Sequence, residues 1–136
     1  MPHDILIASW GGAGPLKAPK GVTLLPSAPH DAVMKEVSLV ITHGGHGTVS
    51  RALRNGLPML LMPMGRDQND IALRVEARGA GLTLPPEASE AEIAAALARL
   101  TKESRFALAA RRLQGAMARE ITSERLVEEI EEIARP

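Results

Sequence analysis

The chain has 136 residues, 45% hydrophobic and 24% charged, a composition typical of a folded domain rather than a disordered segment. Sixteen basic and sixteen acidic side chains cancel, and Trp10 and Phe106 are the only aromatic residues, so no basic or base-stacking surface for nucleic acid is expected. The lack of cysteine excludes disulfides and thiolate ligands, and no apolar run reaches the roughly 18 residues of a membrane span. We expect one soluble, cytoplasmic domain over residues 1–136.

Five short, uninterrupted apolar runs predict strands that are buried on both faces of a sheet. They lie at residues 4–9, 22–25, 38–42, 59–62 and 81–84. Helical patterns fall between them at residues 30–36, 47–55 and 69–78, and Gly56 and Gly79 stand where helix-terminating glycines are expected. This alternation predicts an α/β fold with a Rossmann-like parallel sheet flanked by helices.

The pattern becomes purely helical near Ser89. Ser89 and Glu92 form a capping box that predicts a helix to about residue 100, and further helices are expected at residues 103–119 and 123–134. The domain therefore divides into an α/β part over about residues 1–88 and a helical part over residues 89–136. Because the charges of the helical part balance, we expect its helices to pack on the flank of the domain rather than to bind a partner.

A glycine-rich turn at residues 43–48, His-Gly-Gly-His-Gly-Thr, joins a predicted strand to a helix. Such a turn lets backbone amides approach a ligand, and the helix N-terminus adds partial positive charge, so the turn suits a phosphate. Thr48 adds a hydroxyl and His43 a ring N–H at the carboxyl edge of the sheet, where open α/β sheets bind ligands. Asp67 and Gln68 follow the next strand and should lie at the same edge.

The order of these motifs resembles the donor-binding signature of inverting two-domain glycosyltransferases, the UDP-glycosyltransferase superfamily. The matching elements are residues 43–48, Gly56-Leu57-Pro58, Pro63, Asp67-Gln68 and Gly79-Ala80-Gly81. The resemblance covers essentially the whole chain as the C-terminal half of such an enzyme and is densest over residues 28–84. It implies a GT-B fold and a hexosyltransferase activity that uses a nucleoside-diphosphate sugar of UDP or dTDP type as donor, without a metal or other cofactor.

The resemblance also implies roles for particular residues. His43, with the amides around Gly45, Gly47 and Thr48, would hold the diphosphate. The nucleobase would face Ser27, Ala28 and His30, and the hydroxyls of the transferred sugar would bind Asp67 and Gln68. The helix N-terminus and His43 would stabilise the leaving diphosphate, since no Asp-x-Asp pair is present. In the family the general base belongs to the N-terminal acceptor-binding half, so no catalytic residue is expected in this chain.

Three positions depart from the family pattern. Ser27 replaces the usual tryptophan, which removes base stacking, and Ile71 stands where asparagine is usual. Arg51 stands where many members carry a glutamate that binds the ribose hydroxyls. A guanidinium cannot accept those hydrogen bonds, so the sequence leaves three alternatives for Arg51: a deoxynucleotide donor, a pairing with phosphate, or an exposed helix position.

Relatives begin this domain with a strand and helix that have no counterpart before residue 4. In the sheet order 3-2-1-4-5-6 that strand is the central one. We therefore predict that the sheet either closes up without it or borrows a strand from a neighbouring copy, which makes a homodimer a hypothesis. The partners expected are a nucleotide-sugar donor and an N-terminal acceptor domain in cis or in trans.

Other interpretations remain at this point. Gly45-x-Gly47-x-x-Ser50 with Asp67 about 20 residues on resembles a dinucleotide-binding oxidoreductase fingerprint. A non-catalytic donor-binding subunit of a split glycosyltransferase would also fit this length. Zinc binding by His43 and His46 and a hydrolase built on Ser50 have weaker support, because the chain lacks cysteine and Ser50 lies inside a predicted helix.

Overall fold

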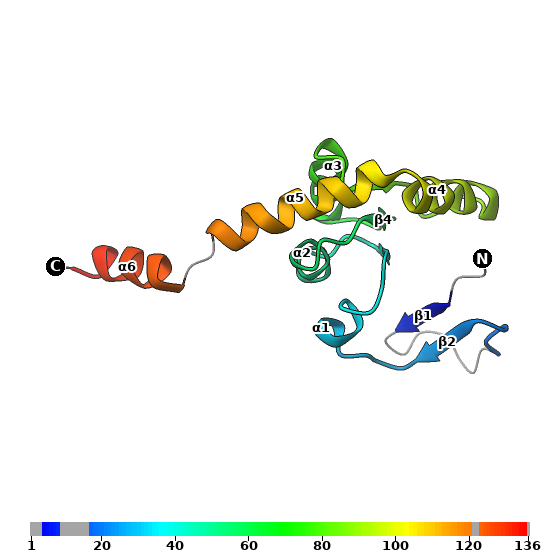
Figure 1. Ribbon diagram of the computed structural model, residues 1–136, viewed down its shortest axis with the longest axis horizontal. Helices are drawn as coiled ribbons and strands as arrows, with labels where there is room; N and C mark the ends of the chain where they lie inside the picture. Colours follow the sequence, from blue (N-terminus) through cyan, green and yellow to red (C-terminus); the bar gives the residue numbers. More distant parts are fainter. Residues whose placement is uncertain (1–3, 9–16, 121–122, 136) are drawn as a thin grey trace.

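A computed structural model describes residues 4–8, 17–120 and 123–135 of the chain (Figure 1). Every predicted strand and helix is present, with ends that differ by at most three residues. The strands are β1 (Ile5–Ala8), β2 (Val22–Leu25), β3 (Val40–Thr42), β4 (Met59–Leu61) and β5 (Gly81–Thr83). The helices are α1 (His30–Val33), α2 (His46–Arg54), α3 (Gln68–Ala77), α4 (Glu90–Lys102), α5 (Ser104–Glu120) and α6 (Ser123–Ile133). Ser9, the last residue of the first predicted strand, lies outside the described residues.

Local signals explain several of these boundaries. Gly56 and Gly79 follow α2 and α3 with φ angles of +65° and +78°, which is the left-handed conformation of a helix-terminating glycine. Ser89 caps α4 by accepting the amide of Glu92 at 3.3 Å, and the Glu92 carboxylate accepts the Ser89 amide at 2.7 Å. The predicted capping box is therefore confirmed.

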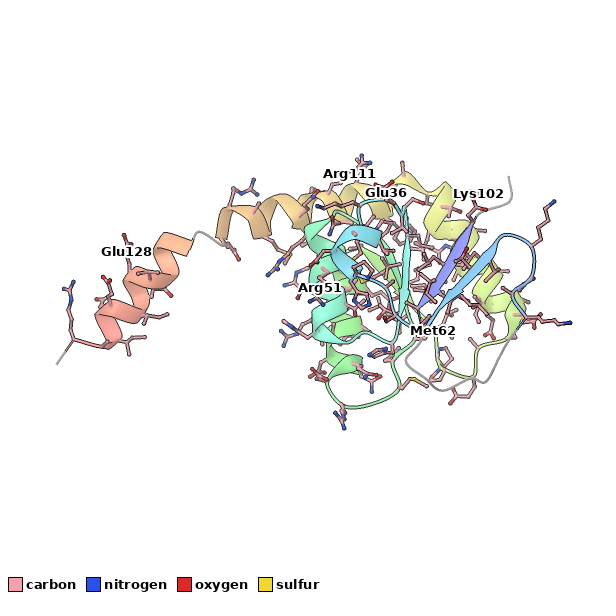
Figure 2. The ribbon with its side chains drawn as sticks, turned by 90° about the horizontal axis from the view of Figure 1, so that it is seen from below. Glu36, Arg51, Met62, Lys102, Arg111 and Glu128 are labelled. Carbon is pink, nitrogen blue, oxygen red and sulfur yellow. The ribbon has the colours of Figure 1, made fainter. Side chains whose placement is uncertain are left out.

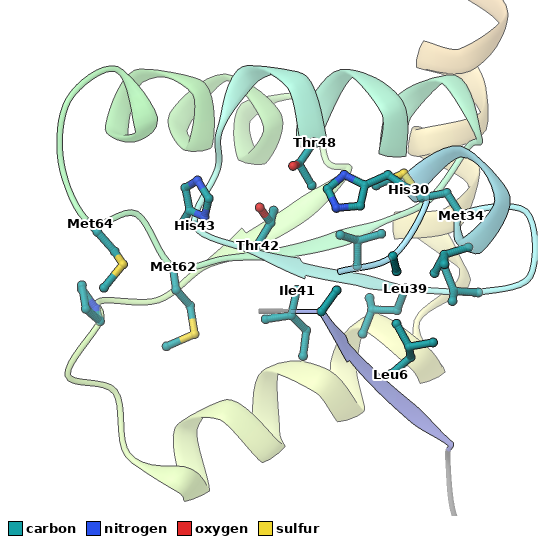
Figure 3. Close-up of a pocket in the computed structure, with 16 residues that line it drawn as sticks. Leu6, His30, Met34, Leu39, Ile41, Thr42, His43, Thr48, Met62 and Met64 are labelled. Carbon is teal, nitrogen blue, oxygen red and sulfur yellow. The ribbon is translucent and has the colours of Figure 1, made fainter. Parts of the chain in front are cut away.

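The strands form two separate parallel sheets rather than one. β1 pairs with β2, and β3, β4 and β5 pair in that order. β1 and β3 face each other across a cavity of about 530 Å³ (Figure 3). We expected the sheet either to close up without the central strand that relatives have or to borrow a strand from a neighbouring copy. The separation of β1 from β3 contradicts the first of these expectations.

The core is centred on β4, where Met59, Leu60 and Leu61 are completely buried. Met59 and Leu61 pack into a cluster with residues of α2, α3 and α5, whereas Leu60 packs on the opposite face with residues of α4 and with Phe106. Successive side chains of a strand point to opposite faces, so β4 separates two helical layers. This part of the chain is the α/β fold with parallel strands that the sequence predicted.

β1 differs from β4 although both strands are uniformly apolar. Ile5, Leu6 and Ile7 are 45%, 40% and 43% exposed, so the expectation that this strand is buried on both faces is wrong. The physical reason is the open space on the side of β1 that faces away from β2, because a parallel strand is buried only when neighbours and helices cover it.

The C-terminal helices also depart from the expectation in one respect. α4 and α5 pack on the domain, and the side-chain amide of Gln114 in α5 donates to the carbonyl of Arg54 at the end of α2 (2.8 Å). α6 instead extends away from the body (Figures 1 and 2), and Val127, Ile130 and Ile133 are exposed. No helix within the described ranges is both long and apolar enough to cross a bilayer.

Candidate functional site

The glycine turn between β3 and α2 has a conformation that only glycine adopts readily. Gly44 has φ +93°, and its amide donates to the hydroxyl of the buried Thr42 at 3.2 Å. A Cβ at Gly44 would also lie 3.4 Å from the backbone oxygen of Gln68. The left-handed backbone and this close approach together direct the chain from the end of β3 into the first turn of α2.

The N-terminus of α2 presents backbone amides without acceptors in the helix. Gly45 is the N-cap and makes no side-chain capping bond, and the first helical bond runs from the amide of Val49 to the carbonyl of Gly45 (3.0 Å). The preceding amides, including those of Gly47 and Thr48, therefore have no intrahelical partner. Because the first turn contains no acidic residue, the positive end of the helix dipole stays uncompensated, as an anion site requires.

His43 covers one side of this turn. Its side chain is exposed and contributes to the cavity between β1 and β3 (Figure 3). A Cβ at Gly45 would lie 2.9 Å from the Nε2 atom of His43, which is closer than real carbon contacts. The imidazole can therefore rest over the backbone of Gly45 only because that residue has no side chain.

The start of α3 lies beside the same turn, as the sequence predicts for groups at neighbouring strand ends. Asp67 is exposed at the N-cap position of α3, and Gln68 is the first residue of the helix. The Oε1 atom of Gln68 accepts the backbone amide of Met64 at 2.8 Å, which holds the β4–α3 loop. The approach of Gln68 to Gly44 places this acid–amide pair next to the glycine turn.

The cavity brings together four of the ten residues that the sequence indicates for donor binding. They are Ala28, His30, His43 and Thr48. Ser27 is exposed directly before Ala28, and Gly45 and Gly47 belong to the glycine turn and first turn of α2 beside the cavity. Asp67, Gln68 and Arg51 do not line the cavity in this structure.

Arg51 forms an ion pair with α1. Its Nε atom lies 3.3 Å from an oxygen of Asp31, with the two side chains 45% and 80% exposed. A Cβ at Gly47 would lie 3.5 Å from the guanidinium of Arg51, so this side chain runs along the first turn of α2. Such an exposed pair contributes little to stability, and the guanidinium is close to the helix N-terminus.

The lining residues that were not singled out from the sequence include Thr42, Met62 and Met64. The hydroxyl of Thr42 accepts the amide of Gly44, and the position of Thr42 as a polar residue at the end of a predicted apolar strand was a usable signal. Met62 and Met64 follow β4 and carry no motif, so only the tertiary structure identifies them. Within the described ranges, no three His, Asp or Glu side chains gather as ligands for a metal ion.

Nearly the whole chain is similar to known proteins. Residues 3–133 match the family described as "Erythromycin biosynthesis protein CIII-like, C-terminal domain". Over 116 residues the chain is 33% identical to 4'-demethylrebeccamycin synthase of Lentzea aerocolonigenes, an alignment that covers 82% of this chain and 27% of that enzyme.

Solved structures give the same result. The calicheamicin glycosyltransferase CalG4 is similar with a TM-score of 0.86 and 27% identity, over 97% of this chain and 37% of that one. The glycosyltransferase VinC, solved in complex with dTDP, is similar with a TM-score of 0.69 and 31% identity, over 73% of this chain and 25% of its own. The chain therefore spans well under half of each of these relatives.

Proposed function

Because the chain belongs to the family of erythromycin biosynthesis protein CIII-like C-terminal domains, we propose that it binds the diphosphate of a nucleoside-diphosphate sugar at the N-terminus of α2. In this proposal it is the donor-binding half of an inverting, metal-independent glycosyltransferase that transfers a sugar to a small-molecule acceptor. The family match supports this interpretation over a dinucleotide-binding oxidoreductase, and it agrees with either a continuous enzyme or a split one.

The observation that carries the proposal is the set of free amides at the start of α2, beside a cavity that His43 and Thr48 line. Backbone amides at a helix N-terminus stabilise a diphosphate without a cation, and the imidazole of His43 adds a further donor. The same groups would stabilise the negative charge that develops on the diphosphate when the bond to the sugar breaks. Ala28 and His30 line the cavity as well, which suits a role near the nucleobase.

Asp67 and Gln68 lie next to the glycine turn and would bind hydroxyls of the transferred sugar once the donor is seated. Arg51 would favour a donor of dTDP type, because its guanidinium cannot accept hydrogen bonds from a ribose 2′-hydroxyl. The complex of the relative VinC with dTDP supports this choice of nucleotide. The 136-residue chain by itself should bind the donor and transfer no sugar, since the general base is expected in an acceptor-binding half.

Calorimetric titration of the purified chain with UDP, dTDP and NAD tests the proposal. We expect both diphosphates to bind, dTDP more tightly, and His43→Ala to weaken binding by roughly 10-fold or more, as for loss of a hydrogen bond to a charged group. His46→Ala is the matched control, because His46 is exposed and contributes nothing to the cavity lining. Binding of NAD alone, or equal losses in the two histidine variants, would contradict the assignment.

A further inference from the structure

The loop between β4 and α3 is held by a side chain as well as by its backbone. The Oε1 atom of Gln68 accepts the amide of Met64 at 2.8 Å. The backbone amide of Gln68 donates to the carbonyl of Gly65 at 3.3 Å. Both bonds run between the first residue of α3 and the loop before it, so Gln68 ties this loop to the helix.

Two residues inside this turn have a left-handed backbone. Gly65 has φ +144° and Arg66 has φ +57°, and Arg66 alone among the described residues other than glycine has a positive φ angle. For a residue with a Cβ this conformation is unfavourable, and it persists only where surrounding interactions hold it. The hydrogen bond from Met64 to Gln68 spans both residues, so it closes the loop around the strained position.

The same loop conformation leaves the carboxylate of Asp67 unused by the helix. An aspartate at an N-cap ordinarily has an extended backbone, and its side chain accepts an amide of the first helical turn. Asp67 is the N-cap of α3, but its φ of −71° and ψ of −8° are helical and its side chain makes no capping bond. Because the side chain is exposed, its oxygens stay available as acceptors for a ligand.

The loop also borders the site proposed for the donor. Met64 is 77% exposed and lines the same cavity as His43. A Cβ at Gly44 would lie 3.4 Å from the backbone oxygen of Gln68, so the start of α3 touches the glycine turn. Within the described ranges the Nε2 atom of Gln68 has no hydrogen-bond partner, which leaves it as a donor.

We propose that Gln68 is a positioning residue for recognition of the transferred sugar. Its Oε1 atom stays on the amide of Met64 and holds the loop so that the carboxylate of Asp67 accepts a hydrogen bond from one sugar hydroxyl. Its Nε2 atom donates to the oxygen of another, so the arrangement fits a donor whose transferred sugar has at least two free hydroxyls. This inference rests on the proposed function and divides the role of Gln68 between its two polar atoms.

The test measures the ratio of the affinity for dTDP-glucose to the affinity for dTDP by calorimetric titration of the full chain. We expect Gln68→Ala to lower this ratio roughly 10-fold or more, because both the held loop and a hydrogen-bond donor are lost. The matched control is Asn69→Ala, since Asn69 is the next residue of α3, is exposed and makes no side-chain hydrogen bond to any described residue. Equal ratios in Gln68→Ala and the parent chain would overturn the proposal.

A second substitution separates positioning from direct contact. Glycine adopts the left-handed backbone of Arg66 without a Cβ, and it adds no group that binds a sugar. Adding Arg66→Gly to Gln68→Ala should therefore raise the ratio by roughly 3-fold or more, because the loop conformation no longer needs to be held. If Gln68 acted only through direct contact with the sugar, the double variant would recover nothing, and that result would refute the positioning role.

Hydrogen exchange reports on the loop without any ligand. Exchange at the amide of Met64 should be roughly 10-fold or more faster in Gln68→Ala and should stay slow in Gln68→Glu, whose carboxylate still accepts that amide. Melting temperatures of the variants show that the fold is retained, and unchanged exchange in Gln68→Ala would contradict the proposal. A parent chain that fails to bind dTDP would refute the proposed function, whereas binding of dTDP with an unchanged ratio in Gln68→Ala would refute only the role of Gln68.

Discussion

Replacing Gly45 with alanine should displace the imidazole of His43 while leaving the fold almost unstrained. The backbone of Gly45, with φ −61° and ψ 136°, is extended and open to any residue. The added Cβ would lie 2.9 Å from Nε2 of His43, whereas ordinary contacts begin at 3.4 Å, so the ring must retreat by roughly half an ångström or rotate away. The distance from the ring nitrogen to an oxygen of a bound diphosphate would then fall outside the narrow range of hydrogen-bond donor–acceptor distances.

The expected loss of affinity follows from that bond. Hydrogen bonds to charged groups contribute about 1.5–3 kcal/mol, so Gly45→Ala should weaken binding of UDP and dTDP by roughly 10- to 150-fold. Stability should change by less than about 1 kcal/mol, because the lower backbone entropy of the unfolded chain opposes the poorer N-cap. The assay is calorimetric titration beside thermal unfolding.

Two controls sharpen the result. Gly115 lies in α5, where an added Cβ would meet nothing closer than the guanidinium of Arg119 at 3.9 Å. Gly115→Ala should therefore stabilise the chain by about 1 kcal/mol and leave its affinity for the donor unchanged. If Gly45 acts through His43, the double variant Gly45→Ala, His43→Ala should bind no more weakly than His43→Ala alone. Full nucleotide affinity in a stably folded Gly45→Ala chain would refute the reasoning.

Two further predictions concern stability. Leu60→Ala removes a completely buried side chain of β4 that packs in a cluster with Phe106, and it should lower the free energy of unfolding in urea by about 2–5 kcal/mol. The control Leu73→Ala truncates an exposed side chain and should lower the free energy of unfolding by less than about 0.5 kcal/mol. Similar losses in the two variants would contradict the assignment of the core. Ser89→Ala removes the N-cap of α4 and should lower the free energy of unfolding by about 1 kcal/mol near neutral pH. Hydrogen bonds from the backbone amide and then the hydroxyl of Ser89 lower the pKa of Glu92. Their contribution to stability is therefore present above the ordinary glutamate pKa and is lost as the pH falls through the depressed pKa. The difference in stability between Ser89→Ala and the parent chain should shrink in acid, and a difference that grew would exclude the ionised capping box.

Features that depend on a few neighbouring residues were predictable from the sequence. The apolar runs placed the strands, Gly56 and Gly79 placed helix ends, and Ser89 with Glu92 placed the start of α4. Each signal acts within one turn or one strand, so distant partners do not alter it. The glycine turn belongs to the same class, because its backbone follows from the glycines themselves.

Features that depend on distant partners were not predictable. Nothing in the sequence of β1 distinguishes it from β4, yet β1 is exposed and β4 is completely buried. The pairing of Arg51 with Asp31 likewise needs α1 and α2 to lie side by side.

The order of the elements, the parallel α/β class and the glycine turn between β3 and α2 therefore follow from the amino-acid sequence alone. The folded chain was needed to show that the described strands form two sheets, that His43 rests over Gly45, and that Leu6, Ala8 and Ile41 line a common cavity. This difference arises because local conformation follows from propensities and capping within a few residues. Burial and hydrogen bonding between strands depend instead on which neighbours the folded chain brings to each edge.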